Sequence, residues 1–113
     1  MHRVSADADV FHVIADGTRR GILDLLTAGE MPARDLGAPF RISQPAVSKH
    51  LAVLRAAGLV SHRQQGGMRI YRLEAAGLQE AFDWVRHYEK FWDLKLQELG
   101  RYLNRRKRKR NKP

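Results

Sequence analysis

The sequence contains no cysteine among its 113 residues. Disulfides, thiolate metal sites, iron–sulfur clusters and cysteine nucleophiles are therefore excluded. No apolar run approaches the roughly 20 residues that a membrane-spanning helix needs, and the first residues lack the apolar core of a signal peptide. We therefore expect a soluble, cytoplasmic protein. Its length favours a single domain with a small core, since 43% of the residues are hydrophobic.

Acidic residues are missing from the middle of the chain. Residues 36–73 contain no Asp or Glu but carry six basic residues, which are Arg41, Lys49, Arg55, Arg63, Arg69 and Arg72. Residues 101–113 add eight basic residues and again no acid, and the whole chain has a formal net charge of +9. A polyanion is the partner that this distribution favours. A tail that only improved solubility would not explain the acid-free stretch.

Three helices are predicted before the middle of the chain. Ser5 is a suitable N-cap for the first, whose apolar residues end at Ile14. A second helix is expected to begin near Thr18 and to end by Gly29. Pro32 suits the first position of a short third helix.

The next segment predicts a well-defined helix over about 44–57. Ser43 is a good N-cap, and Gly58 is a typical stop signal. Apolar residues recur at i, i+4 and i+7 and form one buried stripe: Val47, Leu51 and Leu54. The residues that point away from this stripe are small or polar, and none is acidic: Gln44, Pro45, Ser48, Lys49, Ala52 and Arg55.

A β-hairpin should follow this helix, because residues 59–65 and 68–73 are separated by the two-residue turn Gly66–Gly67. A long terminal helix is then predicted, with a coiled-coil-like stripe widened by Trp84, Tyr88 and Phe91. The stripe consists of Leu78, Phe82, Val85, Trp92, Leu96, Leu99 and Leu103. We expect residues 1–104 to form the folded domain and residues 105–113 to be a disordered basic tail.

This order of elements is that of a winged helix-turn-helix, a mostly α fold with a small β-hairpin. In such a fold two consecutive helices form the helix-turn-helix, which we expect within Pro32–Arg55. The second of them, called the recognition helix, lies in the DNA major groove. Gln44 could pair with adenine, Lys49 could reach guanine or phosphate, and the Ser43 and Ser48 hydroxyls could bind either. On the hairpin, Arg63 and Arg69 would reach flanking phosphates or the minor groove, and we include them with Arg55 and Gln65 among the expected DNA contacts.

Three segments resemble the bacterial ArsR/SmtB family of dimeric winged-helix repressors: IADGTRRGILDLL, ISQPAVSKHLAVLRAAGLV and RQQGGMRIYRL. The resemblance covers about residues 10–103. It implies a homodimer, formed by the first and last helices, on a pseudo-palindromic operator. By motif position it assigns DNA contact to Ser43, Gln44, Pro45, Ser48, Lys49 and His50. The predicted dimer interface consists of Val10, Phe11, Phe82, Val85, Trp92, Leu96 and Leu99.

Three kinds of effector site are conceivable: a thiolate metal site, a metal site of His and carboxylate ligands, and an apolar pocket. Sensing members of that family place cysteines before the recognition helix, and this chain has MPARDLGAPFRI there, so a thiolate sensor is excluded. Asp83 and His87 are one helix turn apart, but further metal ligands at fitting spacing are not evident, and we expect neither metal nor cofactor. The aromatic residues of the terminal helix could form a pocket for an apolar effector, although packing at the dimer interface is favoured.

No spacing of nucleophile, base and carboxylate suggests catalysis, so we do not expect an enzyme. Two other functions stay open. A nonspecific nucleic-acid-binding protein would show little sequence preference, and a protein-interaction module would use the aromatic terminal helix alone. The acid-free recognition helix argues against the second.

Overall fold

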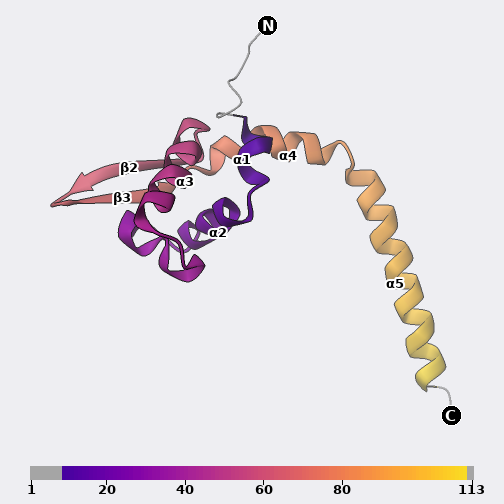
Figure 1. Ribbon diagram of the computed structural model, residues 1–113. Coiled ribbons are helices and arrows are strands. Elements are labelled where there is room, and N and C mark those ends of the chain that lie inside the picture. Colours follow the sequence, from indigo (N-terminus) through magenta and orange to yellow (C-terminus); the bar gives the residue numbers. More distant parts are fainter. Residues whose placement is uncertain (1–8, 112–113) are drawn as a thin grey trace, which may run out of the picture. The chain divides into compact units, whose positions relative to one another are not determined.

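The computed structural model describes the backbone of residues 9–111 and the side chains of residues 9–106 (Figure 1). The chain forms two units, Met1–Ala81 and Phe82–Pro113, which we describe separately. The predicted fold class is confirmed, since helices dominate and one small antiparallel sheet accompanies them. No helix of the described residues is long and apolar enough to cross a membrane.

The first unit begins with two capped helices, α1 (Val10–Ile14) and α2 (Gly17–Leu26). The Asp9 carboxylate caps α1 by accepting from the Phe11 amide at 3.0 Å, and Asp16 caps α2 by accepting from the Arg19 amide at 2.9 Å. The second helix therefore begins before Thr18, because an Asp side chain caps it directly. The predicted cap Ser5 lies outside the described residues.

The predicted short third helix is present only in part, because it is of 3₁₀ type and Pro32 precedes it as the N-cap. The segment consists of a short strand, β1 (Met31–Pro32), and two 3₁₀ helices, η2 (Ala33–Asp35) and η3 (Ala38–Phe40). Pro39 cannot continue a helical ladder, and Arg41 closes the segment in the left-handed conformation at φ 56°. The two 3₁₀ helices still lead directly into the recognition helix.

The helix predicted over about residues 44–57 is confirmed as α3 (Gln44–Ala56). The Ser43 hydroxyl accepts from the Ala46 amide at 3.3 Å, as expected of an N-cap. Gly58, just after the helix, has a φ of 76° that favours glycine. The apolar stripe of α3 is fully buried in the core of this unit. The largest fully buried side chains are Ile22, Leu36, Leu51, Leu54, Leu59, Val13 and Val47.

The predicted hairpin is also present, as β2 (Val60–Gln65) and β3 (Met68–Leu73). Its register pairs Arg63 with Ile70, and Gly66 turns the chain at φ 61°. β1 adds to the far side of β3, which gives a three-stranded antiparallel sheet in the order β1-β3-β2. This third strand was not predicted.

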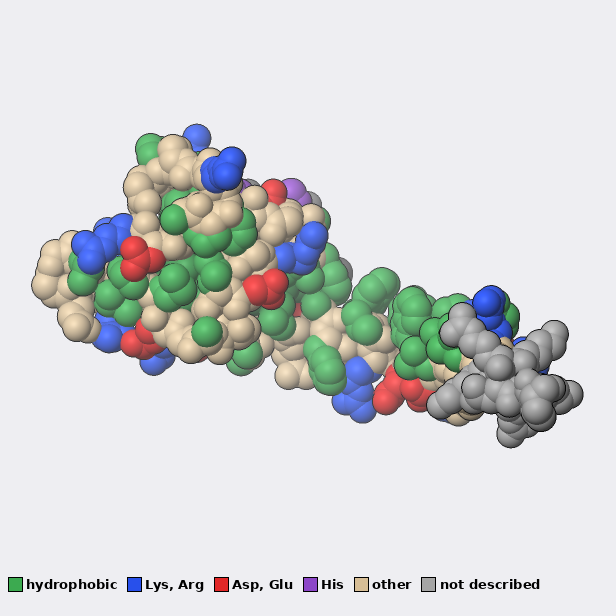
Figure 2. Space-filling view, turned by 90° about the horizontal axis from the view of Figure 1, so that it is seen from below, with side chains coloured by type: hydrophobic (Ala, Val, Ile, Leu, Met, Phe, Trp, Pro, Cys, Tyr) green, Lys and Arg blue, Asp and Glu red, His purple; other side chains and the backbone are tan. Residues whose placement is uncertain are grey.

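The predicted single terminal helix is instead interrupted. A 3₁₀ helix, η4 (Ala75–Leu78), leads into α4 (Gln79–Arg86), and α5 (Glu89–Asn111) begins after a break at His87–Tyr88. Hydrophobic side chains gather on the surface of α4 and α5 in Figure 2. The helix α5 also runs through residues 105–111, and the boundary between domain and tail at residue 104 stays a prediction.

Candidate nucleic-acid interface

The outward face of α3 carries most of the predicted DNA contacts. Besides the N-cap Ser43, its exposed side chains are Gln44, Pro45, Ser48, Lys49, Ala52, Arg55 and Ala56, and none of them is acidic. An exposed helix face with cations and no carboxylate suits the negative potential of a DNA groove. The geometry of α3 thus allows direct contact with base edges and phosphates.

Two of the predicted base-reading side chains already have partners within the chain. Ser43 caps α3, and the Gln44 Nε2 atom donates to the main-chain oxygen of Arg34 at 3.1 Å. Ser48, Lys49 and Arg55 form no such hydrogen bond within the described residues, so they are more available to DNA. Sequence reasoning missed the Gln44 bond because it joins residues in different elements.

His50 differs from its neighbours, because its side chain is only half-exposed and lies beside the start of α2. Its Nδ1 atom is 3.5 Å from Arg19 Nη1 and 4.0 Å from Asp16 Oδ2. The hydrogen bond from the Arg19 amide lowers the pKa of Asp16, and the charges of Arg19 and His50 act in the same direction. These contacts hold the His50 ring against the start of α2, so only part of the ring is left for contact with DNA.

The hairpin of β2 and β3 is the wing, and its Arg63 already has partners within the chain. Its Nη1 atom contacts Glu30 Oε1 at 2.5 Å, and its Nη2 atom donates to Gln65 Oε1 at 2.8 Å. Arg72 likewise donates from Nε to Glu74 at 3.1 Å. Both acids lie just outside the acid-free stretch and were missed by the sequence analysis. Two of the six cations of that stretch are therefore partly neutralised in the free chain.

The other four cations form no ion pair with an acid of the described residues: Arg41, Lys49, Arg55 and Arg69. Two of them act on the same histidine. Burial lowers the pKa of His62, and the charges of Arg55 and Arg69 lower it further. The His62 ring also packs at 5.0 Å from the Tyr71 ring. Arg55 of α3 and Arg69 of the wing are therefore both close enough to His62 to disfavour its protonated form.

A polar hollow of about 400 Å³, which we call the wing notch, opens between η2, the start of α3 and the hairpin tip. It is lined by Pro32, Ala33, Arg34, Gln44, Gln64, Gly67, Met68 and Arg69. Two of these side chains are cationic and none is acidic. Arg34 was not among the predicted contacts, because it precedes the acid-free stretch.

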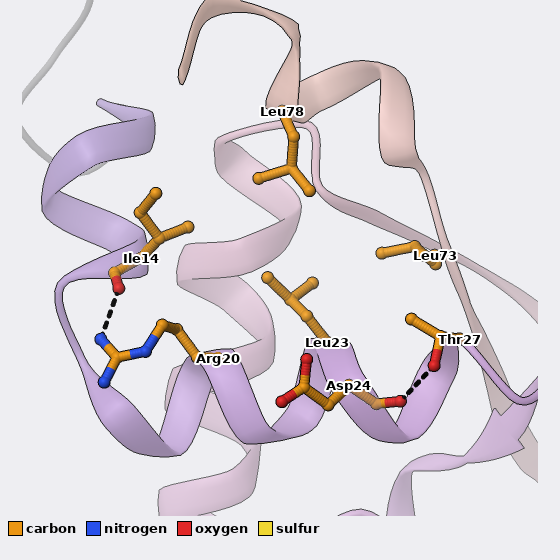
Figure 3. Close-up of a pocket in the computed structure, with 7 residues that line it drawn as sticks. All are labelled: Ile14, Arg20, Leu23, Asp24, Thr27, Leu73 and Leu78. Carbon is orange, nitrogen blue, oxygen red and sulfur yellow. Dashed lines mark hydrogen bonds between the residues drawn. The ribbon is translucent and has the colours of Figure 1, made fainter. Parts of the chain in front are cut away.

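A second hollow, of about 290 Å³, has apolar walls (Figure 3). It is lined by Ile14, Arg20, Leu23, Asp24, Thr27, Leu73 and Leu78. Two of its polar side chains are engaged locally. The Arg20 Nη1 atom donates to the Ile14 carbonyl at 2.8 Å, and the Thr27 hydroxyl donates to the Asp24 carbonyl at 2.6 Å.

The predicted dimer residues divide into two groups. Val10 is 4% exposed and belongs to the core of the first unit, which leaves it little surface for a partner, whereas Phe11 is 36% exposed. The members on α4 and α5 are all half-exposed or more: Phe82, Val85, Trp92, Leu96 and Leu99. Within this helical pair the aromatic rings stack edge-to-face, Trp84 on Tyr88 at 5.3 Å and Phe91 on Trp92 at 5.6 Å.

Asp83 and His87, which were considered as metal ligands, belong to no metal-binding cluster in the part of the chain that the structure describes. No group of three or more His, Asp or Glu side chains that could hold a metal ion occurs there. His87 Nδ1 lies 3.1 Å from the main-chain oxygen of Asp83. The aromatic residues of α4 and α5 line neither of the two hollows described above.

Known proteins show the same architecture. Residues 16–62 match the family model of bacterial regulatory proteins of the arsR family. SdpR, a transcriptional repressor of Bacillus subtilis (strain 168), is 40% identical over 80 residues, which cover 71% of this chain and 89% of SdpR. The arsenical resistance operon repressor of Escherichia coli (strain K12) is 46% identical over 65 residues, which cover 57% of this chain and 56% of that protein.

Among solved structures, a possible transcriptional regulator for arsenical resistance superposes with a TM-score of 0.63 and 38% identity. The superposition covers 85% of this chain and 94% of that protein. The residues that the family model matches include the whole of α3. The chain therefore belongs to the ArsR family of bacterial transcriptional regulators, which are DNA-binding proteins and not enzymes.

Proposed function

We propose that the chain is a homodimeric repressor that binds a pseudo-palindromic DNA site in the cytoplasm. The exposed, acid-free face of α3, with Lys49 and Arg55, is the observation that supports it most directly. In this proposal α3 reads the major groove, and the wing and the basic end of α5 hold the backbone. The contact residues are Ser43, Gln44, Pro45, Ser48, Lys49, His50, Arg55, Arg63, Gln65 and Arg69.

The dimer is supported by the apolar surface of the second unit. Its large hydrophobic side chains are 47–65% exposed in the single chain, from Phe82 to Leu103. An exposed apolar surface of this kind is typical of a protein–protein interface. A two-fold symmetric contact would cover the same stripe on both copies, and it would place the two recognition helices about 34 Å apart.

The deciding experiment is a titration with DNA from upstream of the protein's own coding sequence and with a scrambled duplex. A repressor should bind the first at least about 10³-fold more tightly. Both titrations should be made at two salt concentrations, because phosphate contacts alone give a salt slope without sequence preference. Equal affinity for the two duplexes would instead identify a nonspecific nucleic-acid-binding protein.

Lys49→Ala tests the role of α3 within this proposal. It should weaken binding to the specific site more than to the scrambled duplex, whereas truncation after Leu103 should weaken both alike. Lys90→Ala, which removes the same charge from an exposed position of α5, is the matched control. Equal losses on both duplexes from Lys49→Ala would remove Lys49 from site-specific reading.

The regulator should also act without a thiolate metal sensor, because the chain contains no cysteine. Zinc, cadmium or arsenite at micromolar concentration should leave the DNA complex intact in a fluorescence anisotropy assay. Release by any of these would overturn this part of the proposal.

A further inference from the structure

The wing notch brings together residues that are distant in the sequence. Arg34 comes from η2, Gln44 from the first turn of α3, and Gln64 and Arg69 face each other across the hairpin register. Both cations are exposed, and the lining contains no carboxylate. A site with two guanidinium groups and two amides fits an oxyanion whose charge is spread over several oxygens.

We propose that the wing notch holds one backbone phosphate of duplex DNA, bound by Arg34 and Arg69 together. This inference rests on the proposed function and adds Arg34 to the DNA contacts. A guanidinium group can donate two parallel hydrogen bonds to a phosphate, and the amide groups of Gln44 and Gln64 lie on the same lining. A phosphate in the notch would fix the wing against the recognition helix.

Competing partners for the two arginines are weak. Arg34 Nε is 4.0 Å from Asp35 Oδ1, and both side chains are more than half exposed. Exposed pairs at this distance contribute little, so a phosphate can displace the carboxylate. Arg69 forms no ion pair with a described acid. Arg63, which lies on the same hairpin, is instead paired with Glu30. Arg69 is therefore the wing cation most available to DNA.

Gln44 has a positioning role in this arrangement. Its Nε2 atom donates to the Arg34 carbonyl, which ties η2 to the first turn of α3. Bidentate reading of adenine would need both Nε2 and Oε1 of the amide. The bond to Arg34 uses one of the two N–H donors of Nε2, so Gln44 keeps the second donor and Oε1 while it holds the Arg34 main chain at the notch.

The salt dependence of binding tests the notch on both the upstream and the scrambled duplex. Each lost phosphate contact lowers the slope of log K against log salt by about 0.9. Because the two arginines share one phosphate, the double variant Arg34→Gln/Arg69→Gln should lower the slope by about 0.9 per bound chain. Arg34→Lys should keep most of the slope, and Lys90→Gln is the matched control at an unrelated exposed position.

A slope unchanged in the double variant, or lowered by about 1.8 per bound chain, would overturn the single shared phosphate. On the upstream duplex, single methylphosphonate linkages locate the contact. One neutral linkage should weaken wild-type binding and have no effect on the double variant, while it still weakens Lys49→Ala. If no linkage behaves in this way, the notch is not a phosphate site.

Inorganic phosphate should compete with the backbone for the notch, so at matched ionic strength it should weaken duplex binding by the wild-type protein more than by the double variant. Equal weakening of both would place the competing anion away from the notch and overturn the proposal. Failure of the underlying function looks different, because wild-type protein would then bind neither duplex. Equal binding of both duplexes with the expected slope change would retain the notch and reject only sequence-specific reading.

Discussion

Ser61, Arg72 and Glu74 form a hydrogen-bonded triad at the base of the wing. The Ser61 hydroxyl donates to Glu74 Oε2 at 2.6 Å, and Arg72 Nε donates to Ser61 Oγ at 2.9 Å and to the same carboxylate oxygen at 3.1 Å. The hydrogen bond from Ser61 is the main cause that lowers the pKa of Glu74, followed by the one from Arg72. Both bonds favour the ionised carboxylate.

The pH dependence of the triad follows from the direction of this shift. Because the folded-state pKa of Glu74 is depressed, its contribution to stability is present above the pKa of the unfolded chain. This contribution is lost as the pH falls through the depressed pKa. The variant Ser61→Ala should therefore raise the pKa of Glu74 toward the ordinary glutamate value, as measured by an NMR titration of its carboxyl carbon. Ser48→Ala is the control, and an unchanged Glu74 pKa in Ser61→Ala would assign the shift to Arg72 alone.

Close backbone approach at Gly77 leads to a second prediction at this scale. A Cβ atom added to Gly77 would overlap the main-chain oxygen of Gly58. We expect Gly77→Ala to lower the free energy of unfolding by about 1–3 kcal/mol, the usual cost of overpacking, in urea titrations. Gly67→Ala, whose Cβ would meet nothing within 4 Å, should change it far less. Equal effects of the two substitutions would contradict the close contact.

At the scale of elements, the recognition helix depends on its first residues. Ser43 both caps α3 and lies at the proposed DNA surface. Loss of an N-cap costs about 1 kcal/mol, and an Asp side chain caps as well as Ser does. The cap and the DNA contact can therefore be separated by charge.

Ser43→Ala should lower the free energy of unfolding by about 1 kcal/mol, measured by urea titration of the circular dichroism signal. Ser43→Asp should keep that stability but weaken DNA binding, because it places a carboxylate against the phosphates. If Ser43→Asp bound DNA as tightly as wild type, the start of α3 would not face the backbone.

Elements with strong local signals were predictable from the sequence. The stripe of α3 and the Gly66–Gly67 turn each determine a structure within a few residues, and both are confirmed. β1 was missed because two residues carry no periodicity, and its pairing with β3 is nonlocal. The stripe has a gap at Glu89, but the break at His87–Tyr88 was missed because the neighbouring aromatic row, Trp84, Tyr88 and Phe91, keeps helical spacing across it. The ion pair of Glu30 with Arg63 was missed because it joins separate segments.

At the scale of the whole molecule, the two units differ in what they leave exposed. The first unit has a buried core that includes Ala81, whereas none of the described side chains of the second unit, residues 82–106, is buried. Helices gain most of their stability in proteins from packing an apolar face. The apolar side chains of the second unit are therefore expected to be buried by another protein surface, which in our proposal is a second copy of the chain.

Leu96→Asp should produce monomers, because a carboxylate would be buried at the interface without a partner. Gln97→Asp places the same charge at an exposed polar position of α5 and should leave the dimer intact. Sedimentation velocity at micromolar concentration distinguishes the two outcomes. A dimer of unchanged stability in Leu96→Asp would exclude this stripe from the interface.

The position of the tryptophans gives the protein a built-in optical reporter. The chain has two, Trp84 and Trp92, and both belong to the second unit, where each is 55% exposed. Emission excited selectively from tryptophan thus originates only in α4 and α5. Covering these rings should shift the emission to shorter wavelength, while the winged helix contributes no signal of its own. Dilution followed by fluorescence would then report association of the helices, independently of DNA contact at α3.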